Sequence, residues 1–464
     1  MDITSQLVVS TKNPFSRSFR IGVFVSLLLI ACSLPILGIP LASVALLLIA
    51  VALLWMAFRF PIFALGAVLA FMPIYPVLIL VARFFGPSYL MSNAVLACDR
   101  VVLLLLTSIL WWRNGIKFKP PDLLLVICFA LAIGRLAFGG SFLALLSDFN
   151  LMIAYFAGRM ALLSRDQEKT WAKRAVWIVA ILSILGMAEV FFIGEAPRAI
   201  LYSTVADEQV TEAGALNGTF HAEGFTGLRE SSTMFGPLQF ASLCMVGIII
   251  WWVYGQNLGL GVAIVAGLVC TVTRSAWLGT ALAIPVLAVL MHQKKRLLLH
   301  AALALGLFIA AIPVVGIGDF LFAAKKGEDP SAQGHQQSLF MGLEYALNHP
   351  FGSGPGNVGM WGTKTNSIGV FIESTYLTLA AQYGIVTAIC FMAFVISALR
   401  TCWRKRTSLG YVAVGILVGF GAVMTVAPLH NVFSLASWVW FPVGLAIQSD
   451  DNAKLEFARD SSTS

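Results

Sequence analysis

Residues 233–254 read TMFGPLQFASLCMVGIIIWWVY, a stretch of 22 residues that contains no charged side chain. A helix of this length crosses the roughly 30 Å of hydrocarbon in a bilayer and satisfies its own backbone polar groups there. The chain contains thirteen similar apolar segments, which we predict to be further spans: residues 21–39, 41–58, 61–82, 94–112, 121–138, 143–160, 174–193, 257–272, 276–292, 297–316, 374–399, 409–427 and 430–447.

The composition points to the same class of protein. Of the 464 residues, 59% are apolar and only 11% are charged, whereas a soluble protein has about 25% charged residues. The apolar runs are unbroken, unlike the alternating segments of an outer-membrane β-barrel. We therefore predict an all-α polytopic membrane protein with about 12–14 transmembrane helices, in which residues 1–464 form a single integral membrane domain.

Charge placement predicts the orientation. Lysine and arginine gather in alternate loops, at residues 113–119, 159–174, 294–296 and 400–406. The positive-inside rule places these loops and both termini in the cytoplasm, and it explains the net charge of +8 without a nucleic-acid partner. Residues 194–232 and 318–372 are then the two long external loops. Chemistry is expected on the external side.

Five charged residues fall inside apolar segments, each in the outer half of its predicted helix: Asp99, Arg100, Arg135, Asp148 and Glu189. A charge in a bilayer is costly unless it is paired or faces water. These residues either line an outward-facing polar cavity or pair with one another, for instance Arg135 with Asp148.

Two arginines are candidate anion ligands. Arg229 ends the first external loop, and Arg274 lies in the short turn TVTRSAWLG at residues 271–279. The planar fork of a guanidinium matches a phosphate group. As alternatives, Arg229 could bind lipid headgroups at the interface, and the turn at Arg274 could reflect helix capping by Ser275.

The large external loop contains a short amphipathic helix and a glycine-rich turn. His335 precedes leucines at helical spacing, and HPFGSGPG follows at residues 349–356, beginning with His349. Glycine permits the close approach of a ligand or of another backbone segment. We expect the helix to lie along the outer membrane face.

A carboxylate ends this loop. Glu373, in FIESTYL at residues 371–377, lies at the entrance of what reads as one long helix that continues past Gly384. It could be a helix cap, which the helix dipole would stabilise, or a general base for an acceptor hydroxyl. His430 also falls on the predicted external side, as a secondary base or a sugar contact.

Together these motifs resemble a known superfamily. The Thr-Arg-Ser turn, the His-Pro-x-Gly-x-Gly-x-Gly segment and the Glu-Ser-x-Tyr-Leu…Gln-Tyr-Gly-Ile helix start are similar to those of the O-antigen ligase and Wzy-type polysaccharide polymerase superfamily. The resemblance runs from about residue 215 to residue 445. It implies a GT-C-like glycosyltransferase of the bacterial inner membrane with its active site facing the periplasm.

The resemblance also implies roles for individual residues. Arg274 and Arg229 would hold the diphosphate of an undecaprenyl diphosphate-linked glycan, and Glu373 would be catalytic. His335, His349 and His430 would contact the sugar or the acceptor. The reaction would be inverting, without a metal or another cofactor. Partners would be the bilayer, the lipid-linked glycan, and chain-length regulator and flippase proteins, with no nucleic acid.

One departure from the family pattern decides between activities. Ligases that attach O-antigen to lipid A core tend to carry histidine and asparagine where this chain has Glu373 and Ser374. The difference favours polymerisation of repeat units into exopolysaccharide, capsule or O-antigen. The alternatives are an O-antigen ligase, a transporter or flippase for lipid-linked sugars, and a non-catalytic scaffold in an envelope assembly.

Overall fold

The structure is a computed structural model that describes residues 52, 55, 59–78, 89–194, 230–234, 236–292, 330–358 and 372–462, without the side chains of 89–98, 330–333 and 449–462. All regular elements in these ranges are helices. They are α3 (Pro61–Phe71), α5 (Tyr89–Asn114), α6 (Pro120–Leu136), α7 (Phe142–Asp148), α8 (Leu151–Met160), α9 (Arg165–Ala188), the π-helix η3 (Glu189–Ile193), α12 (Pro237–Tyr254), α13 (Leu258–Cys270), α14 (Arg274–Leu290), α17 (Pro330–Asn348), α19 (Thr375–Tyr383), α20 (Ile385–Lys405), α21 (Ser408–Val423), the 3-10 helix η4 (Leu429–Asn431) and α22 (Phe433–Ser462).

Three of these elements are long and apolar enough to cross a membrane: α9 continued by η3, α12, and α20. Six further apolar helical segments of 10–17 residues accompany them. Large apolar side chains remain exposed on α5, α9 and α20, as expected for a surface that faces lipid. The protein is therefore an all-helical membrane protein in the part that the structure describes. The count of 12–14 spans stays a prediction.

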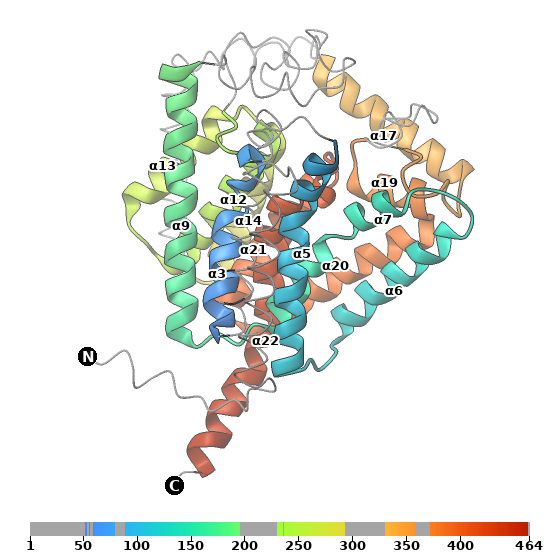
Figure 1. Ribbon diagram of the computed structural model, residues 1–464. Coiled ribbons are helices and arrows are strands. Elements are labelled where there is room, and N and C mark those ends of the chain that lie inside the picture. The colour runs from blue at the N-terminus through green and yellow to red at the C-terminus, as the bar shows by residue number, and fades with distance from the viewer. Residues whose placement is uncertain are drawn as a thin grey trace, which may run out of the picture.

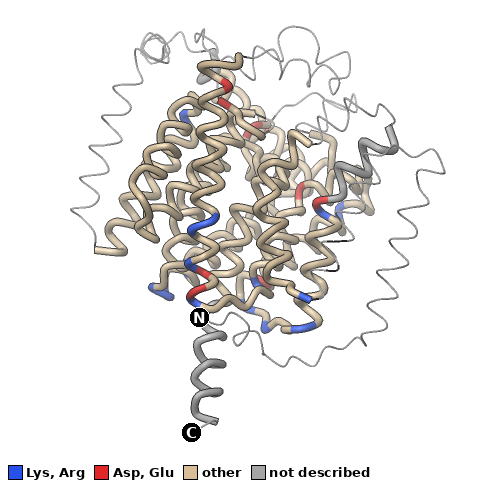
Figure 2. Tube along the Cα trace, turned by 60° about the vertical axis from the view of Figure 1, so that its left-hand side comes forward, with Lys and Arg blue, Asp and Glu red and all other residues tan. Residues whose placement is uncertain are grey.

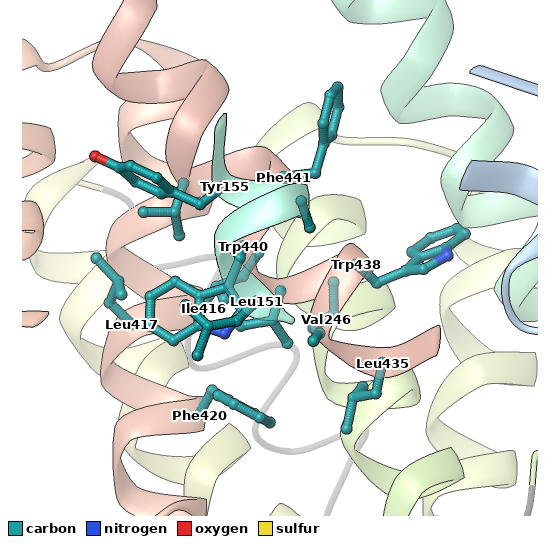
Figure 3. Close-up of a cluster of buried hydrophobic side chains, with 14 of the residues drawn as sticks. Leu151, Tyr155, Val246, Ile416, Leu417, Phe420, Leu435, Trp438, Trp440 and Phe441 are labelled. Carbon is teal, nitrogen blue, oxygen red and sulfur yellow. The ribbon is translucent and has the colours of Figure 1, made fainter. Parts of the chain in front are cut away.

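The bundle is built around α12, which is buried on nearly all sides. Figure 1 shows the longer helices running side by side, with α17 lying obliquely across one end next to α19. A helix that is apolar all round belongs in such a centre. Around it, aromatic and aliphatic side chains of α8, α12, α21 and α22 interlock, with Trp440 fully buried among them (Figure 3).

Glycines set the closest helix crossings. A Cβ placed on Gly158 of α8 would lie 2.2 Å from the Phe441 carbonyl oxygen of α22, and one on Gly444 would lie 2.1 Å from that of Tyr155. Small residues at the contact let helix backbones approach closely in a membrane. The same device joins α14 to α21, where a Cβ on Gly279 would lie 2.7 Å from the Gly419 carbonyl oxygen.

Two predicted spans are each broken into two helices. Residues 143–160 form α7 and α8 with a turn at Phe149 and Asn150, and residues 374–399 form α19 and part of α20 with a break at Gly384. Gly384 adopts φ +95°, which an ordinary residue rarely does. The prediction of one long helix after Glu373 is therefore wrong. Predicted spans 21–39 and 297–316 lie outside the described residues, as does nearly all of 41–58.

The two ends of the bundle differ in charge. We call the end formed by residues 113–119, 159–174 and 400–406 the basic end; lysines and arginines gather there in Figure 2. At this end Lys119, the N-cap of α6, and Lys405 of α20 both donate to the Ile447 carbonyl of α22, at 2.7 and 2.9 Å. The opposite end is formed by residues 137–150, 271–273, 349–358, 372–374 and 424–432. The side of the membrane on which each end lies stays a prediction.

Candidate functional site

Glu373 is paired with a histidine from another element of the predicted external loop. Its Oε2 contacts Nδ1 of His335 on α17, 38 positions earlier in the chain. The backbone N–H of Glu373 donates to Ser338 Oγ of the same helix at 2.9 Å. The Glu373 side chain is 23% exposed and that of His335 is 44% exposed. The fold thus joins two predicted site residues in a pair that solvent and ligands can reach.

The cap of α19 is supplied by a different residue. Ser374 Oγ accepts the backbone N–H of Leu377 at 3.4 Å, the usual arrangement of a serine N-cap. The Glu373 carboxylate is engaged by His335 instead. The hydrogen-bonding cap of α19 is therefore Ser374, and Glu373 lies one residue before it.

The glycine-rich turn approaches backbone. The N–H groups of Ser353 and Gly354 donate to the carbonyls of Ala381 and Gln382 near the end of α19, at 2.8 and 2.9 Å. A Cβ on Gly352 would lie 2.5 Å from the Gln382 carbonyl oxygen. The sequence predicted that these glycines permit the close approach of a ligand or of another backbone segment, and in the structure they approach backbone. The turn satisfies carbonyl groups that the break at Gly384 would otherwise leave without partners.

Arg274 lies at the same end of the bundle as Glu373. It is the first residue of α14, it is partly buried, and the N-cap is Thr273 rather than Ser275. Gly279, one turn further along α14, packs against Gly419 and Val423 of α21. The next residue, Met424, accepts the backbone N–H of Thr375 at 2.9 Å. A short series of packed residues therefore links the start of α14 to the start of α19.

The segment that carries these features is also similar to a known family. Residues 259–392 match the O-antigen ligase family. The match confirms the superfamily resemblance drawn from the motifs, over part of the predicted range 215–445. It supports a membrane enzyme of the O-antigen ligase or polymerase type. No curated protein matches the chain.

The O-antigen ligase match covers most of the predicted site. Arg274, His335, His349 and Glu373 lie within residues 259–392, whereas His430 lies beyond them. His349 is exposed and stacks on Tyr345 of α17, with ring centroids 4.2 Å apart, so its imidazole is accessible beside the glycine turn. Arg229 precedes the matched range and lies outside the described residues. Its predicted role stays a prediction.

His430 is placed in the interior. Its ring is fully buried in η4, with Nε2 3.4 Å from Asp148 Oδ1 and Nδ1 3.2 Å from Thr375 Oγ1. Asp148 also accepts a hydrogen bond from the Tyr383 hydroxyl at 2.8 Å. Sequence reasoning noted both Asp148 and His430 but did not connect them. Their shared position at the predicted external ends of two segments was the available signal.

Arg135 does not pair with Asp148. Its guanidinium donates to the Gly352 carbonyl and lies over the Phe138 ring, 5.2 Å from the centroid. The proposed structural pairing of these two charges is wrong, because the glycine turn supplies the oxygen that Arg135 binds. Within the described residues, no group of three or more His, Cys, Asp or Glu side chains could hold a metal ion.

Glu230 is a buried carboxyl that sequence reasoning missed. It lies in the loop before α12, its side chain contacts Gly186 of α9, and neither of its carboxyl oxygens has a hydrogen-bond partner among the residues that the structure describes. Burial raises the pKa of this carboxyl well above its usual value, and the charge of Glu189 raises it further. Its position one residue after Arg229 gave no sign of burial.

Proposed function

We propose that the chain is a glycosyltransferase that polymerises undecaprenyl diphosphate-linked oligosaccharide repeat units into exopolysaccharide, capsule or O-antigen. The observation that carries the proposal is the contact between Glu373 and His335 at the end of the bundle where Arg274 begins α14. The match of residues 259–392 to the O-antigen ligase family supports the same reaction class.

The proposed reaction is a single displacement. The acceptor hydroxyl oxygen forms a bond to the anomeric carbon, and the bond from that carbon to the diphosphate oxygen breaks. The bonding electrons leave with undecaprenyl diphosphate, and the hydroxyl proton passes to the Glu373 carboxylate. Attack and departure on opposite faces of the sugar invert the anomeric centre, as in inverting glycoside hydrolysis.

The described residues suit these roles. Glu373 is partly shielded by α17, which favours general-base catalysis over exchange with bulk water. Contact with His335 orients the carboxylate and offers the accepted proton a route to solvent through an exposed ring. Arg274, with Arg229, would neutralise the charge that develops on the departing diphosphate.

A reconstituted assay tests this proposal. Purified protein in liposomes is given the undecaprenyl diphosphate-linked repeat unit alone, in the presence of EDTA, and the products are separated by size. A ladder of carrier-linked glycans supports polymerisation without a divalent metal. Movement of intact substrate across the bilayer with no new glycosidic bond would instead support the transporter alternative.

A ligase remains the second candidate, because the matching family is described as O-antigen ligase. Adding lipid A core to the same assay separates the two activities. Transfer to lipid A core without a ladder on the carrier would favour the ligase. The presence of Glu373 and Ser374 in place of a His-Asn pair favours the polymerase.

We further propose that the site faces the periplasm across the bacterial inner membrane. Glu344 is exposed on α17, so a Glu344→Cys variant reports the side on which this helix lies. Labelling of intact spheroplasts by an impermeant maleimide, above that of the unsubstituted chain, is the expected result. Labelling only after lysis would place the site in the cytoplasm.

A further inference from the structure

A buried polar chain lies behind Glu373 and joins elements far apart in sequence. Its members are Tyr383 and Thr375 of α19, Asp148 at the end of α7, and His430 of η4, and each is at most 4% exposed. None of these side chains is accessible to a substrate in this structure. The proposed reaction gives these four side chains no role, and sequence similarity to the O-antigen ligase family does not reach His430.

Hydrogen bonds and one close contact connect these four side chains. The Thr375 hydroxyl donates to the Ala427 carbonyl at 2.9 Å, so it accepts from His430 Nδ1. The other ring nitrogen, Nε2, then faces Asp148 Oδ1 at 3.4 Å. The second oxygen of Asp148 accepts from the Tyr383 hydroxyl.

These polar side chains connect both ends of α19 to the Asp148 carboxylate. Tyr383 is the last residue of α19 and donates a hydrogen bond to Asp148. Thr375 is the first, and it bonds to His430, whose Nε2 contacts Asp148 at 3.4 Å. A helix of nine residues has little stability of its own, and Gly384 separates it from α20. The orientation of α19 therefore depends on these contacts and on the glycine turn.

We propose that Asp148 and His430 are positioning residues that hold α19 so that Glu373 stays against His335. The expected effect on kcat rests on the proposed function, whereas the expected displacement of α19 and Glu373 does not. Glu373 is two residues before Thr375, whose N–H and hydroxyl are both held by the segment after α21. A shift of that anchor moves the carboxylate that would accept the proton, while Arg274 on α14 stays in place.

Substitutions at Asp148 test the proposal. Asp148→Leu removes the hydrogen bond from Tyr383 and the contact with His430. It should lower kcat by about 10- to 100-fold, the effect of a misplacement near 1 Å, with the KM for lipid-linked substrate unchanged. Asp148→Asn has the same shape; its amide N–H can donate to His430 Nε2 and its oxygen can accept from Tyr383. It should restore most of the lost turnover. Ser437→Ala is the matched control, because Ser437 is a buried α22 serine whose hydroxyl donates to the Phe433 carbonyl of its own helix.

A spectroscopic measurement separates this inference from the proposed function. In ¹⁵N-histidine spectra of the purified protein, the His335 signals report contact with Glu373. They should change in Asp148→Leu and return in Asp148→Asn, whether or not transfer is detected. If Asp148→Leu does not fold, Tyr383→Phe removes a single hydroxyl and should give a smaller change of the same kind.

Different failures contradict different claims. Absence of transfer by the wild-type protein, with the expected His335 changes, overturns the proposed function alone. Unchanged His335 signals and unchanged kcat in folded Asp148→Leu overturn the positioning role. A raised KM for the substrate with normal kcat would also overturn the positioning role, because it would assign these buried polar residues to substrate binding.

Discussion

Each end of the bundle contains a buried carboxylate, and the two carboxylates differ in how many hydrogen bonds they accept. At the basic end, Arg159 donates to both oxygens of Asp122 at 2.8 Å, and the Tyr155 hydroxyl adds a third bond at 2.6 Å. At the opposite end, Asp148 accepts one hydrogen bond, from Tyr383 at 2.8 Å. The neighbouring His430 Nε2 and Asn150 Oδ1 are buried without a hydrogen-bond partner in the part of the chain that the structure describes. A fully satisfied buried network rigidifies a core, whereas each buried polar group without a partner lowers stability.

The largest effect is expected from breaking the hydrogen-bond network around Asp122 at the basic end. Arg159→Met leaves the Asp122 carboxylate buried without its charge partner, which should destabilise the protein by about 3–5 kcal/mol. Thermal unfolding in detergent measures this. The double variant Asp122→Asn with Arg159→Met should recover much of the loss. If Arg159→Met is stable but inactive, the basic end takes part in the reaction and the contrast between the ends fails.

The next effect concerns the exposed pair. Glu373→Gln keeps the shape of the side chain but removes the proton acceptor, so turnover should fall by about 100-fold or more. Binding of the lipid-linked substrate, measured separately on monodisperse protein, should remain. Glu344→Gln, a change of the same kind on exposed α17, is the control. Near-normal transfer by Glu373→Gln would move the base to His335 or His349.

Arg274 and Arg404 provide a matched comparison between the ends. Lysine keeps the charge of arginine but loses the bidentate fork. Arg274→Lys should raise the KM for the lipid-linked substrate by about 10-fold, the equivalent of one charge-assisted hydrogen bond. Arg404→Lys, an exposed change at the basic end, should alter nothing. Equal kinetics for both variants would rule out diphosphate binding through the Arg274 fork.

The smallest effect is a pH dependence of stability. The folded-state pKa of Glu230 lies well above its usual value of 4.5. Above pH 4.5 the unfolded chain releases a proton that the folded chain keeps, so this residue makes stability fall as the pH rises. Glu230→Gln has no such proton. Its unfolding temperature should therefore fall less than that of the wild type between pH 4.5 and 7.5; equal slopes would mean that Glu230 has a hydrogen-bond donor.

The sequence by itself determined the class of protein and much of its local structure. Runs of apolar residues predicted the helices α5, α6, α12 and α13, and the leucine spacing after His335 predicted α17. These inferences succeed because hydropathy and helical period are local properties, read from neighbouring residues. The motifs around Arg274 and Glu373 also predicted the superfamily that residues 259–392 match.

Only the tertiary structure decided where helices break and which polar groups meet. The apolar sequence around Gly384 predicts one continuous span. The structure breaks the helix there, and the carbonyls freed by the break are satisfied by Ser353 and Gly354 from another part of the chain. In the same way, Arg135 and Asp148 find partners on the glycine turn and on α19 instead of each other. A buried polar group requires a partner, but its own sequence neighbourhood does not specify which one, since that depends on how distant segments pack.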